Sequence, residues 1–122
     1  GDSIAVEQSG GNATVNNTFT ETVYNGGSIS GILAPDRSLG SVQKWTLTGD
    51  ITLNPPNNMA AGQSLTLILT QDGAGNHLLT ANSAYIFASG FNVLSNAAGS
   101  INMLNSFYDG SIYYVTLTVG YV

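Results

Sequence analysis

Apolar and polar residues alternate along most of this 122-residue chain, and this two-residue period constrains the fold more than any other feature. Between residues 44 and 53, the large apolar side chains fall on one side of an extended chain and most of the polar ones fall on the other. This is the pattern of a β-strand with one buried face, because successive strand side chains point to opposite sides. No window shows the period of an amphipathic helix, so the sequence predicts an all-β protein.

Turn-forming residues separate the predicted strands. Asn54-Pro55-Pro56 ends the first strand, because proline lacks the amide donor that a sheet ladder needs. Residues 64–71 form a second strand that is apolar on both faces, which places it in the middle of the sheet and beside the first. The Gly- and Asn-containing segment 72–76 then predicts a hairpin turn into a return strand over residues 77–81.

The C-terminal segment carries the strongest hairpin signal. Asp109-Gly110 separates two alternating runs, residues 101–108 and 111–119, and predicts a hairpin with a type I′ turn. About eight short strands without helices indicate an antiparallel β-sandwich of the jelly-roll kind. The chain shows no internal repeat of roughly 20 to 50 residues, which disfavours a solenoid.

The N-terminal segment differs from the rest of the chain. Residues 1–25 read as extended but contain more polar than apolar residues, so they are a poor anchor for a core. We therefore predict an extended N-terminal arm over residues 1–25, which pairs with another subunit or forms an edge strand, and a β-sandwich domain over residues 26–122.

Charge and composition exclude several classes of partner. The chain has 2 Lys plus Arg against 7 Asp plus Glu and a formal net charge of −5, so it cannot neutralise a run of nucleic-acid phosphates. It contains no apolar run of roughly 18 residues, so membrane insertion is not expected. Charged residues make up 7% of the chain, and 12 Thr, 13 Asn and 13 Ser supply polarity instead. Such a surface is typical of an extracellular or virion protein.

The titratable residues give little support for catalysis. His77 is the one histidine, and no cysteine is present, so any imidazole-dependent scheme rests on a single side chain. Asp72 and Asp109 stand in Gly-containing turns, where a carboxylate commonly bonds its own backbone. The segment after Asp72 lacks the alternating oxygen ligands of a calcium loop. We therefore predict no enzymatic activity, no metal and no cofactor.

The tyrosines allow three interpretations. Tyr108, Tyr113, Tyr114 and Tyr121 gather around the last predicted hairpin. Tyrosines on a sheet bind sugar rings through apolar contact and a hydroxyl, but they also pack across strands or fill subunit interfaces.

The order of the segments from Asp36 onward resembles the C-terminal domains of bacteriophage tail-fibre and related virion appendage proteins. The features that carry the resemblance are a TLTGDITL strand, an LTLIL strand followed by QDGAGN, a short FASG turn and a terminal FYDG hairpin. It covers residues 36–122. The resemblance implies a noncatalytic β-domain on a virion, commonly a homotrimer, that contacts the host surface or completes the particle.

The leading hypothesis is thus a structural and adhesive virion domain at the tip of a tail fibre or a capsid fibre, with copies of itself, other virion proteins and a host-surface glycan or protein as partners. One alternative is a secreted lectin-like carbohydrate-binding module. Another is a small glycan-cleaving enzyme with an active site built across subunits. Because loops carry variable function on rigid scaffolds, the predicted receptor-binding residues lie in or beside turns: Asn76, His77, Phe91, Tyr108 and Tyr113.

Overall fold

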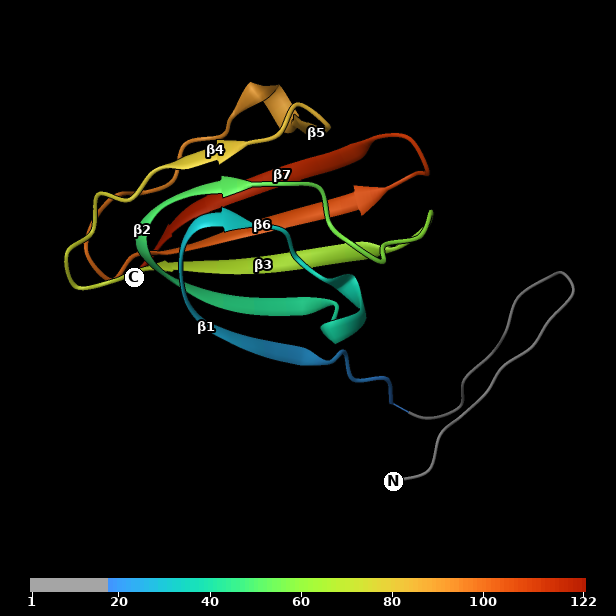
Figure 1. The fold of residues 1–122 in the computed structure, drawn as a ribbon, viewed down its shortest axis with the longest axis horizontal. Coiled ribbons are helices and arrows are strands. Elements are labelled where there is room, and N and C mark those ends of the chain that lie inside the picture. The colour runs from blue at the N-terminus through green and yellow to red at the C-terminus, as the bar shows by residue number, and fades with distance from the viewer. Residues whose placement is uncertain (1–17) are drawn as a thin grey trace, which may run out of the picture.

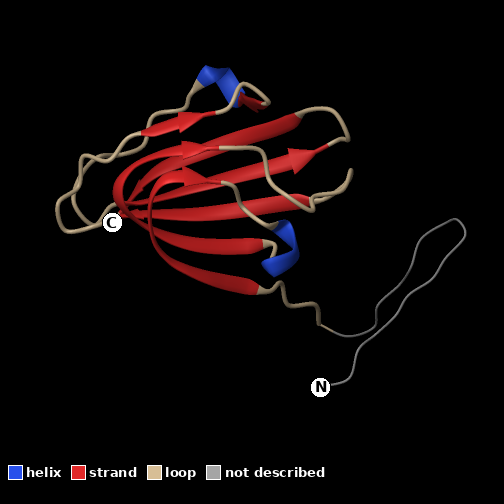
Figure 2. Ribbon diagram, viewed as in Figure 1, coloured by secondary structure: helices blue, strands red, loops and turns tan. Residues whose placement is uncertain are grey.

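The computed structural model describes residues 18–122, which form seven strands and two single-turn 3-10 helices (Figures 1 and 2). The all-β prediction is confirmed. No helix in this part of the chain is long and apolar enough to cross a membrane. The elements are β1 Val23–Leu33, η1 Arg37–Leu39, β2 Val42–Leu53, β3 Ser64–Gln71, β4 Leu79–Ala81, β5 Tyr85–Phe87, η2 Ala88–Gly90, β6 Ile101–Tyr108 and β7 Tyr113–Tyr121.

The strands form one mixed sheet in the order β1-β2-β3-β6-β7-β5, with β4 paired to β2. The β1–β2 and β2–β3 pairs are parallel, the β3–β6 and β6–β7 pairs are antiparallel, and β5 joins β7 in parallel. The prediction of a wholly antiparallel, jelly-roll-like sandwich is therefore wrong in strand direction. The physical reason is that β1 and β2 each bend and send the chain back through a second layer before the next strand begins (Figure 1).

The bends produce solenoid-like coils. The first half of β2, residues 42–47, pairs with β3, whereas residues 51–53 pair with β4. Val23, Val42 and Thr66 occupy equivalent positions in three successive coils, spaced 19 and 24 residues apart. The sequence disfavoured a solenoid because coils of unequal length, closed by different loops, leave no repeat to detect.

Close contact between neighbouring bends explains a glycine in β2. Gly49 lies where β2 turns into the second layer, beside the equivalent bend of β1. A Cβ atom added at Gly49 would lie 3.0 Å from the Cβ atom of Ser30. The two bends thus stack closely because one of them carries no side chain.

The segment 72–76 is a corner and not a hairpin turn. The chain leaves β3 at Gln71 and enters β4, which pairs in parallel with β2 and not with β3. The predicted turn-forming residues are confirmed, since Gly75 and Asn76 have positive φ angles of 67° and 61°. The choice of partner strand was wrong, because alternation gives no information about which strand lies alongside.

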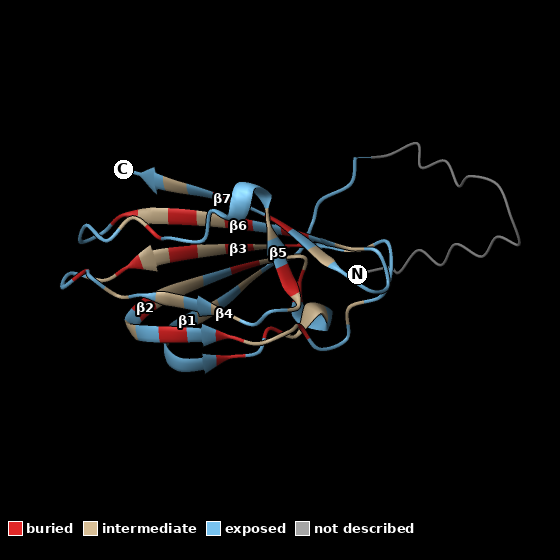
Figure 3. Ribbon diagram, turned by 90° about the horizontal axis from the view of Figure 1, so that it is seen from above, coloured by how far each residue is buried: buried red, intermediate tan, exposed pale blue. Residues whose placement is uncertain are grey.

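The core lies between the two layers, and the predicted faces of the strands are confirmed. Leu47, Ile51 and Leu53 of β2 are at most 2% exposed, and they pack with Leu65, Leu67 and Leu69 of β3. Figure 3 shows buried bands along β2, β3 and β6, whereas most of β1 is exposed. Burial of each leucine stabilises the fold by about 1.5 to 3 kcal/mol relative to exposure.

The C-terminal hairpin is confirmed with one change in its turn. Tyr108 pairs with Tyr113, and the amide of Asp109 donates to the carbonyl of Ile112 over 3.2 Å. The central residues of the turn are therefore Gly110 and Ser111. Of these two, only Gly110 has a positive φ, so the turn is not the expected type I′, which needs positive φ at both positions.

The structure describes only part of the N-terminal segment for which predictions were made. The expected boundary at residues 25 and 26 lies within β1, which runs without interruption from Val23 to Leu33. Most of the predicted arm over residues 1–25 lies outside residues 18–122, so its pairing with another subunit stays a prediction.

Candidate functional site

The structure places the five predicted receptor-binding residues in three separate parts of the domain. Asn76 and His77 lie in the corner between β3 and β4. Tyr108 and Tyr113 pair across the β6–β7 hairpin at the opposite end of the sheet. Phe91 is 44% exposed and follows η2. The five residues thus do not converge on one site, and their role in receptor binding stays a prediction.

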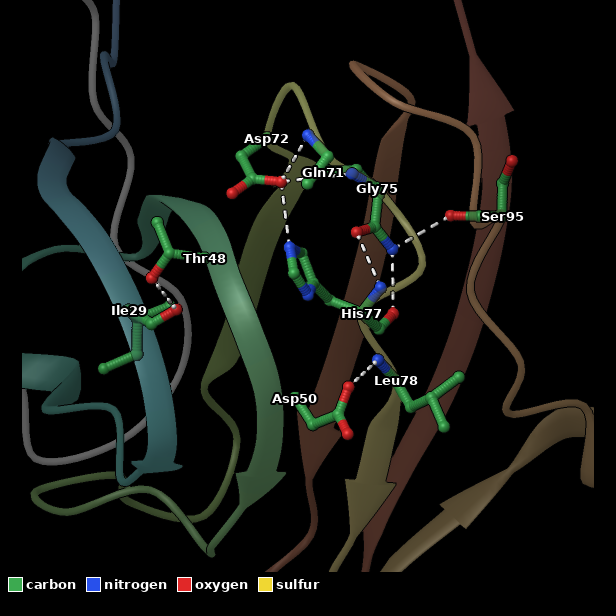
Figure 4. A network of polar contacts seen from close by, with 10 residues as sticks. Ile29, Thr48, Asp50, Gln71, Asp72, Gly75, His77, Leu78 and Ser95 are labelled. Carbon is green, nitrogen blue, oxygen red and sulfur yellow. Dashed lines mark hydrogen bonds and ion pairs between the residues drawn. The ribbon is translucent and has the colours of Figure 1, made fainter.

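The corner between β3 and β4 is held by the buried amide of Gln71 (Figure 4). Its Nε2 donates to the carbonyls of His77 and Ser95 over 2.8 and 3.2 Å. Its Oε1 accepts from the amide of His77 over 3.1 Å. The Gln71 side chain therefore connects β3 to two loops, and we call these three hydrogen bonds the Gln71 clamp.

Asp72 and His77 form a close pair within this corner. The Nε2 atom of His77 lies 2.8 Å from Oδ1 of Asp72, which also accepts from the amides of Ala74 and Gly75. The bond to His77 is the main cause of the lowered pKa of Asp72, and the backbone amides lower that pKa further. All these contacts stabilise the carboxylate and the loop, which is the role of a turn residue.

Three tyrosines pack together on the core side of the sheet at the hairpin end. The rings of Tyr108 and Tyr113 are nearly parallel with centroids 4.3 Å apart, and Tyr85 lies 5.4 Å from Tyr113. The hydroxyl of Tyr85 donates to the carbonyl of Asn54 over 2.7 Å. Burial raises the pKa of Tyr85, and the nearby Tyr113 raises it further. Cross-strand packing is thus one use of the tyrosine cluster.

A groove of about 430 Å³ lies on the outer face of the sheet at the same end, and we call it the β5 groove. Ile86, Tyr114 and Phe107 form an apolar row across it, because strand register sets Tyr114 opposite both other residues. The three side chains are between 45% and 52% exposed. The groove is lined by Ser64, Ile86, Phe87, Ala88, Asn105, Ser106, Phe107, Tyr114, Val115 and Thr116.

A polar row lies beside the apolar row. Asn105 of β6 is in register with Thr66 of β3 on one side and Thr116 of β7 on the other. The hydroxyl of Thr66 donates to Oδ1 of Asn105 over 2.7 Å, which orients the amide and leaves its Nδ2 as the outward donor. The floor of the β5 groove therefore combines an aromatic platform with hydrogen-bonding groups.

Comparison with known proteins identifies the family. A family model described as "Putative phage tail fibre C-terminal domain" matches residues 33–113, about two thirds of the chain. The chain belongs to this family. The resemblance noted from the sequence is thereby confirmed, and membership gives the tail fibre domain a structural, virion-associated role. Comparisons with curated proteins and with solved structures found no match.

The acidic residues of the tail fibre domain bear on the enzyme alternative. Asp72 and Asp109 lie beyond opposite ends of the eight-residue strands β3 and β6, and the strand register puts them roughly 30 Å apart at about 3.3 Å per residue. A pair of carboxylates for glycoside cleavage needs a separation of about 5 to 10 Å. Within one subunit these two side chains therefore cannot act together. Among residues 18–122, no three His, Asp or Glu side chains lie close enough to hold a metal ion.

Sequence reasoning missed the residues that line the β5 groove. Tyr114 and Phe107 could have been paired from the hairpin register, since both face away from the core side of their strands. The contribution of Ile86 carried no such signal, because the three-residue β5 joins β7 through a long-range parallel pairing.

Proposed function

We propose that this tail fibre domain is a noncatalytic fibre tip that assembles as a homotrimer and carries contacts to the host surface. The observation that supports the proposal most directly is the family match over residues 33–113. The composition agrees with it, because a surface with 7% charged residues and abundant Thr, Asn and Ser suits a particle that persists outside cells.

The β1 edge is the surface that we assign to contacts between copies, and we define it by Phe19, Val23 and Ile32. These side chains are 79%, 50% and 68% exposed. The outer side of β1 pairs with no other strand in the described part of the chain, and an open edge beside apolar side chains invites association. Register shifts before Gly27 and Gly31 interrupt a straight ladder, which favours side-chain contacts over simple strand addition.

The oligomeric mass of the full chain tests the proposal. We expect multi-angle light scattering to give three times the 12.6 kDa of the monomer, with the trimer persisting on dilution. The double substitution Val23→Ser and Ile32→Ser should shift the population toward the monomer, because both side chains are already exposed in one subunit and the fold does not depend on them.

Leu78→Ser is the matched control, since Leu78 is 60% exposed but lies at the corner between β3 and β4. Its mass should equal that of the unsubstituted chain. A stable monomer at high protein concentration would contradict the trimer, and a double variant of unchanged mass would exclude the β1 edge as the contact surface.

A further inference from the structure

We infer that the β5 groove binds an uncharged saccharide through the face of a pyranose ring. The inference rests on the proposed function and deepens it by naming the ligand class and the site of host contact. The groove volume of about 430 Å³ lies within the range of about 300 to 1,000 Å³ that small-molecule sites occupy.

The apolar row offers the platform that a sugar ring needs. One face of a pyranose presents C–H groups, which pack against aromatic and aliphatic side chains, and its rim presents hydroxyls. Tyr114 stands at the centre of the row between Phe107 and Ile86. Its hydroxyl donates to Oδ2 of Asp109 over 3.1 Å, so the hairpin turn fixes the ring before any ligand arrives.

The polar row lies where the rim of such a ring would reach. Asn105 offers the Nδ2 donor, because its Oδ1 is already engaged by Thr66. Thr116 offers a hydroxyl that can donate and accept. Side by side, the two rows match the two chemical surfaces of a single sugar residue. A purely apolar partner would leave the amide of Asn105 buried without a bond.

Charge decides between neutral and anionic sugars. All ten residues that line the groove are uncharged. The nearest acid along the hairpin is Asp109, whose carboxylate is tied to Tyr114 and whose pKa is lowered by the amides of Ile112 and Ser111. The chain as a whole carries a formal net charge of −5. No cation lines the groove to offset the charge of a uronic or sialic acid. The nearest one is Arg37 at the margin, and its Nε is already engaged by the carbonyl of Ser64 over 2.8 Å.

The position of the groove favours a ligand over a second copy of the chain. In the strand order, β5 and β1 are the two opposite ends of the sheet. If the β1 edges of three copies meet around the threefold axis, the groove stays open. The mixture of polar and apolar rows also differs from the apolar centre of a typical homodimer interface.

Affinity electrophoresis of the full chain tests the inference with polysaccharides as probes. Gels would be cast with a neutral glucan, galactan or mannan, and a parallel gel with polygalacturonate. We expect at least one neutral polymer to retard the chain and polygalacturonate not to do so. An NMR titration with oligosaccharides of the retarding polymer should shift the amide signals of Asn105, Phe107 and Tyr114.

Three substitutions separate the two rows. Tyr114→Ala should weaken binding about tenfold or more, because it removes the centre of the platform, whereas Tyr114→Phe should stay within about threefold. Asn105→Asp keeps the acceptor for Thr66 but replaces the donor, and it should weaken binding several-fold. Tyr121→Ala is the matched control, since Tyr121 is 45% exposed at the far end of β7 and should leave binding unchanged.

The outcomes separate this inference from the proposed function. A trimer that no neutral polysaccharide retards would overturn the saccharide site while leaving the fibre-tip proposal standing. A retarded monomer would support the site and contradict the trimer. Loss of the trimer in Tyr114→Ala would identify the groove as a contact between copies, and equal loss of binding in Tyr121→Ala or preference for polygalacturonate would also overturn the inference.

Discussion

The parallel coils of β1 to β4 and the antiparallel β6–β7 hairpin use the same alternating sequence pattern but are fixed by contacts of different range. In the hairpin, Oδ1 of Asp109 accepts from the amides of Ser111 and Ile112, two and three residues away. In the coils, Gln71 bonds to His77 and to Ser95, which is 24 residues away. Hairpin geometry is therefore encoded locally, whereas coil geometry depends on the rest of the fold.

Buried amides bind loops near the ends of strands, in the coils and at the start of β6. Gln43 donates to the carbonyls of Asp36 and Gly40, and Asn102 accepts from the amide of Ser95 while donating to the carbonyl of Leu69. Each amide is buried and points to the core side of its strand. Loops that return to a parallel strand expose backbone groups in the interior, and these side chains satisfy some of them.

The largest expected effect tests whether the two regions share one core. Leu47 in the coils and Leu104 in the hairpin are both 0% exposed. Replacing either with Ala should lower the free energy of unfolding by about 2 to 5 kcal/mol, through lost burial and a residual cavity. In urea denaturation, both variants should keep a single transition with an unchanged slope. Two separate transitions in Leu104→Ala would show that hairpin and coils unfold independently.

The next effect isolates the Gln71 clamp. Gln71→Ala should cost about 1 to 3 kcal/mol, because it leaves the partly buried carbonyl and amide of His77 without partners. It also removes one of the two bonds to the carbonyl of Ser95, which keeps the bond from the hydroxyl of Ser100. The loss should appear first as faster amide hydrogen exchange near residues 77 and 95. Thr118→Ala, on an exposed position of β7, is the control and should change stability by less than about 0.5 kcal/mol. Unchanged exchange in the corner would contradict the clamp.

An effect of similar size concerns the start of the coils, where Trp45 covers β1. A Cβ atom added at Gly26 would lie 2.3 Å from Cζ3 of Trp45, so Gly26→Ala forces the indole ring to move. We expect a loss of about 1 to 3 kcal/mol from overpacking and a red-shifted fluorescence of the single tryptophan. Gly73→Ala is the comparison, because nothing lies within 4 Å of its added Cβ atom. Equal emission spectra in the two variants would exclude the predicted displacement.

These contacts explain how much the sequence could reveal. The buried faces of β2 and β3 and the Asp109-Gly110 hairpin were predictable, because alternation and turn residues act over a few positions. The partner of β4 was not, since residues 79–81 pair with residues 51–53 across a corner. Gln43, Gln71 and Asn102 did carry a readable signal: each is a polar residue at a core-facing position near the end of a strand, where an amide commonly binds a loop.

The site was less predictable than the fold. Tyr108 and Tyr113 were chosen from the hairpin, but the register turns them toward the core side and turns Tyr114 outward. The alternation of inward and outward side chains along β7 could have been predicted from the sequence. The position of β5, which supplies Ile86 to the groove, could not be predicted, because no local sequence signal indicates that β5 pairs with β7.

The smallest expected effect compares the carboxylates that hold the two kinds of turn. His77 lowers the pKa of Asp72 in the coil corner, and the amides of Ile112 and Ser111 lower that of Asp109 in the hairpin. A carboxylate with a lowered pKa in the folded state binds protons more weakly there than in the unfolded chain. Its stabilising contribution is therefore fully present above the ordinary pKa of 3.8 and is lost as the pH falls through the lower pKa of the folded state.

The substitutions Asp72→Asn and Asp109→Asn keep an acceptor oxygen but remove the charge. Each should therefore flatten the acid limb of a plot of urea midpoint against pH. Because the Asp72 contact spans the corner, Asp72→Asn should also increase amide hydrogen exchange at residues 74 and 75. Asp109→Asn should increase amide hydrogen exchange only at residues 111 and 112. If the acid limb is unchanged in both variants, the loss of stability in acid comes from other groups.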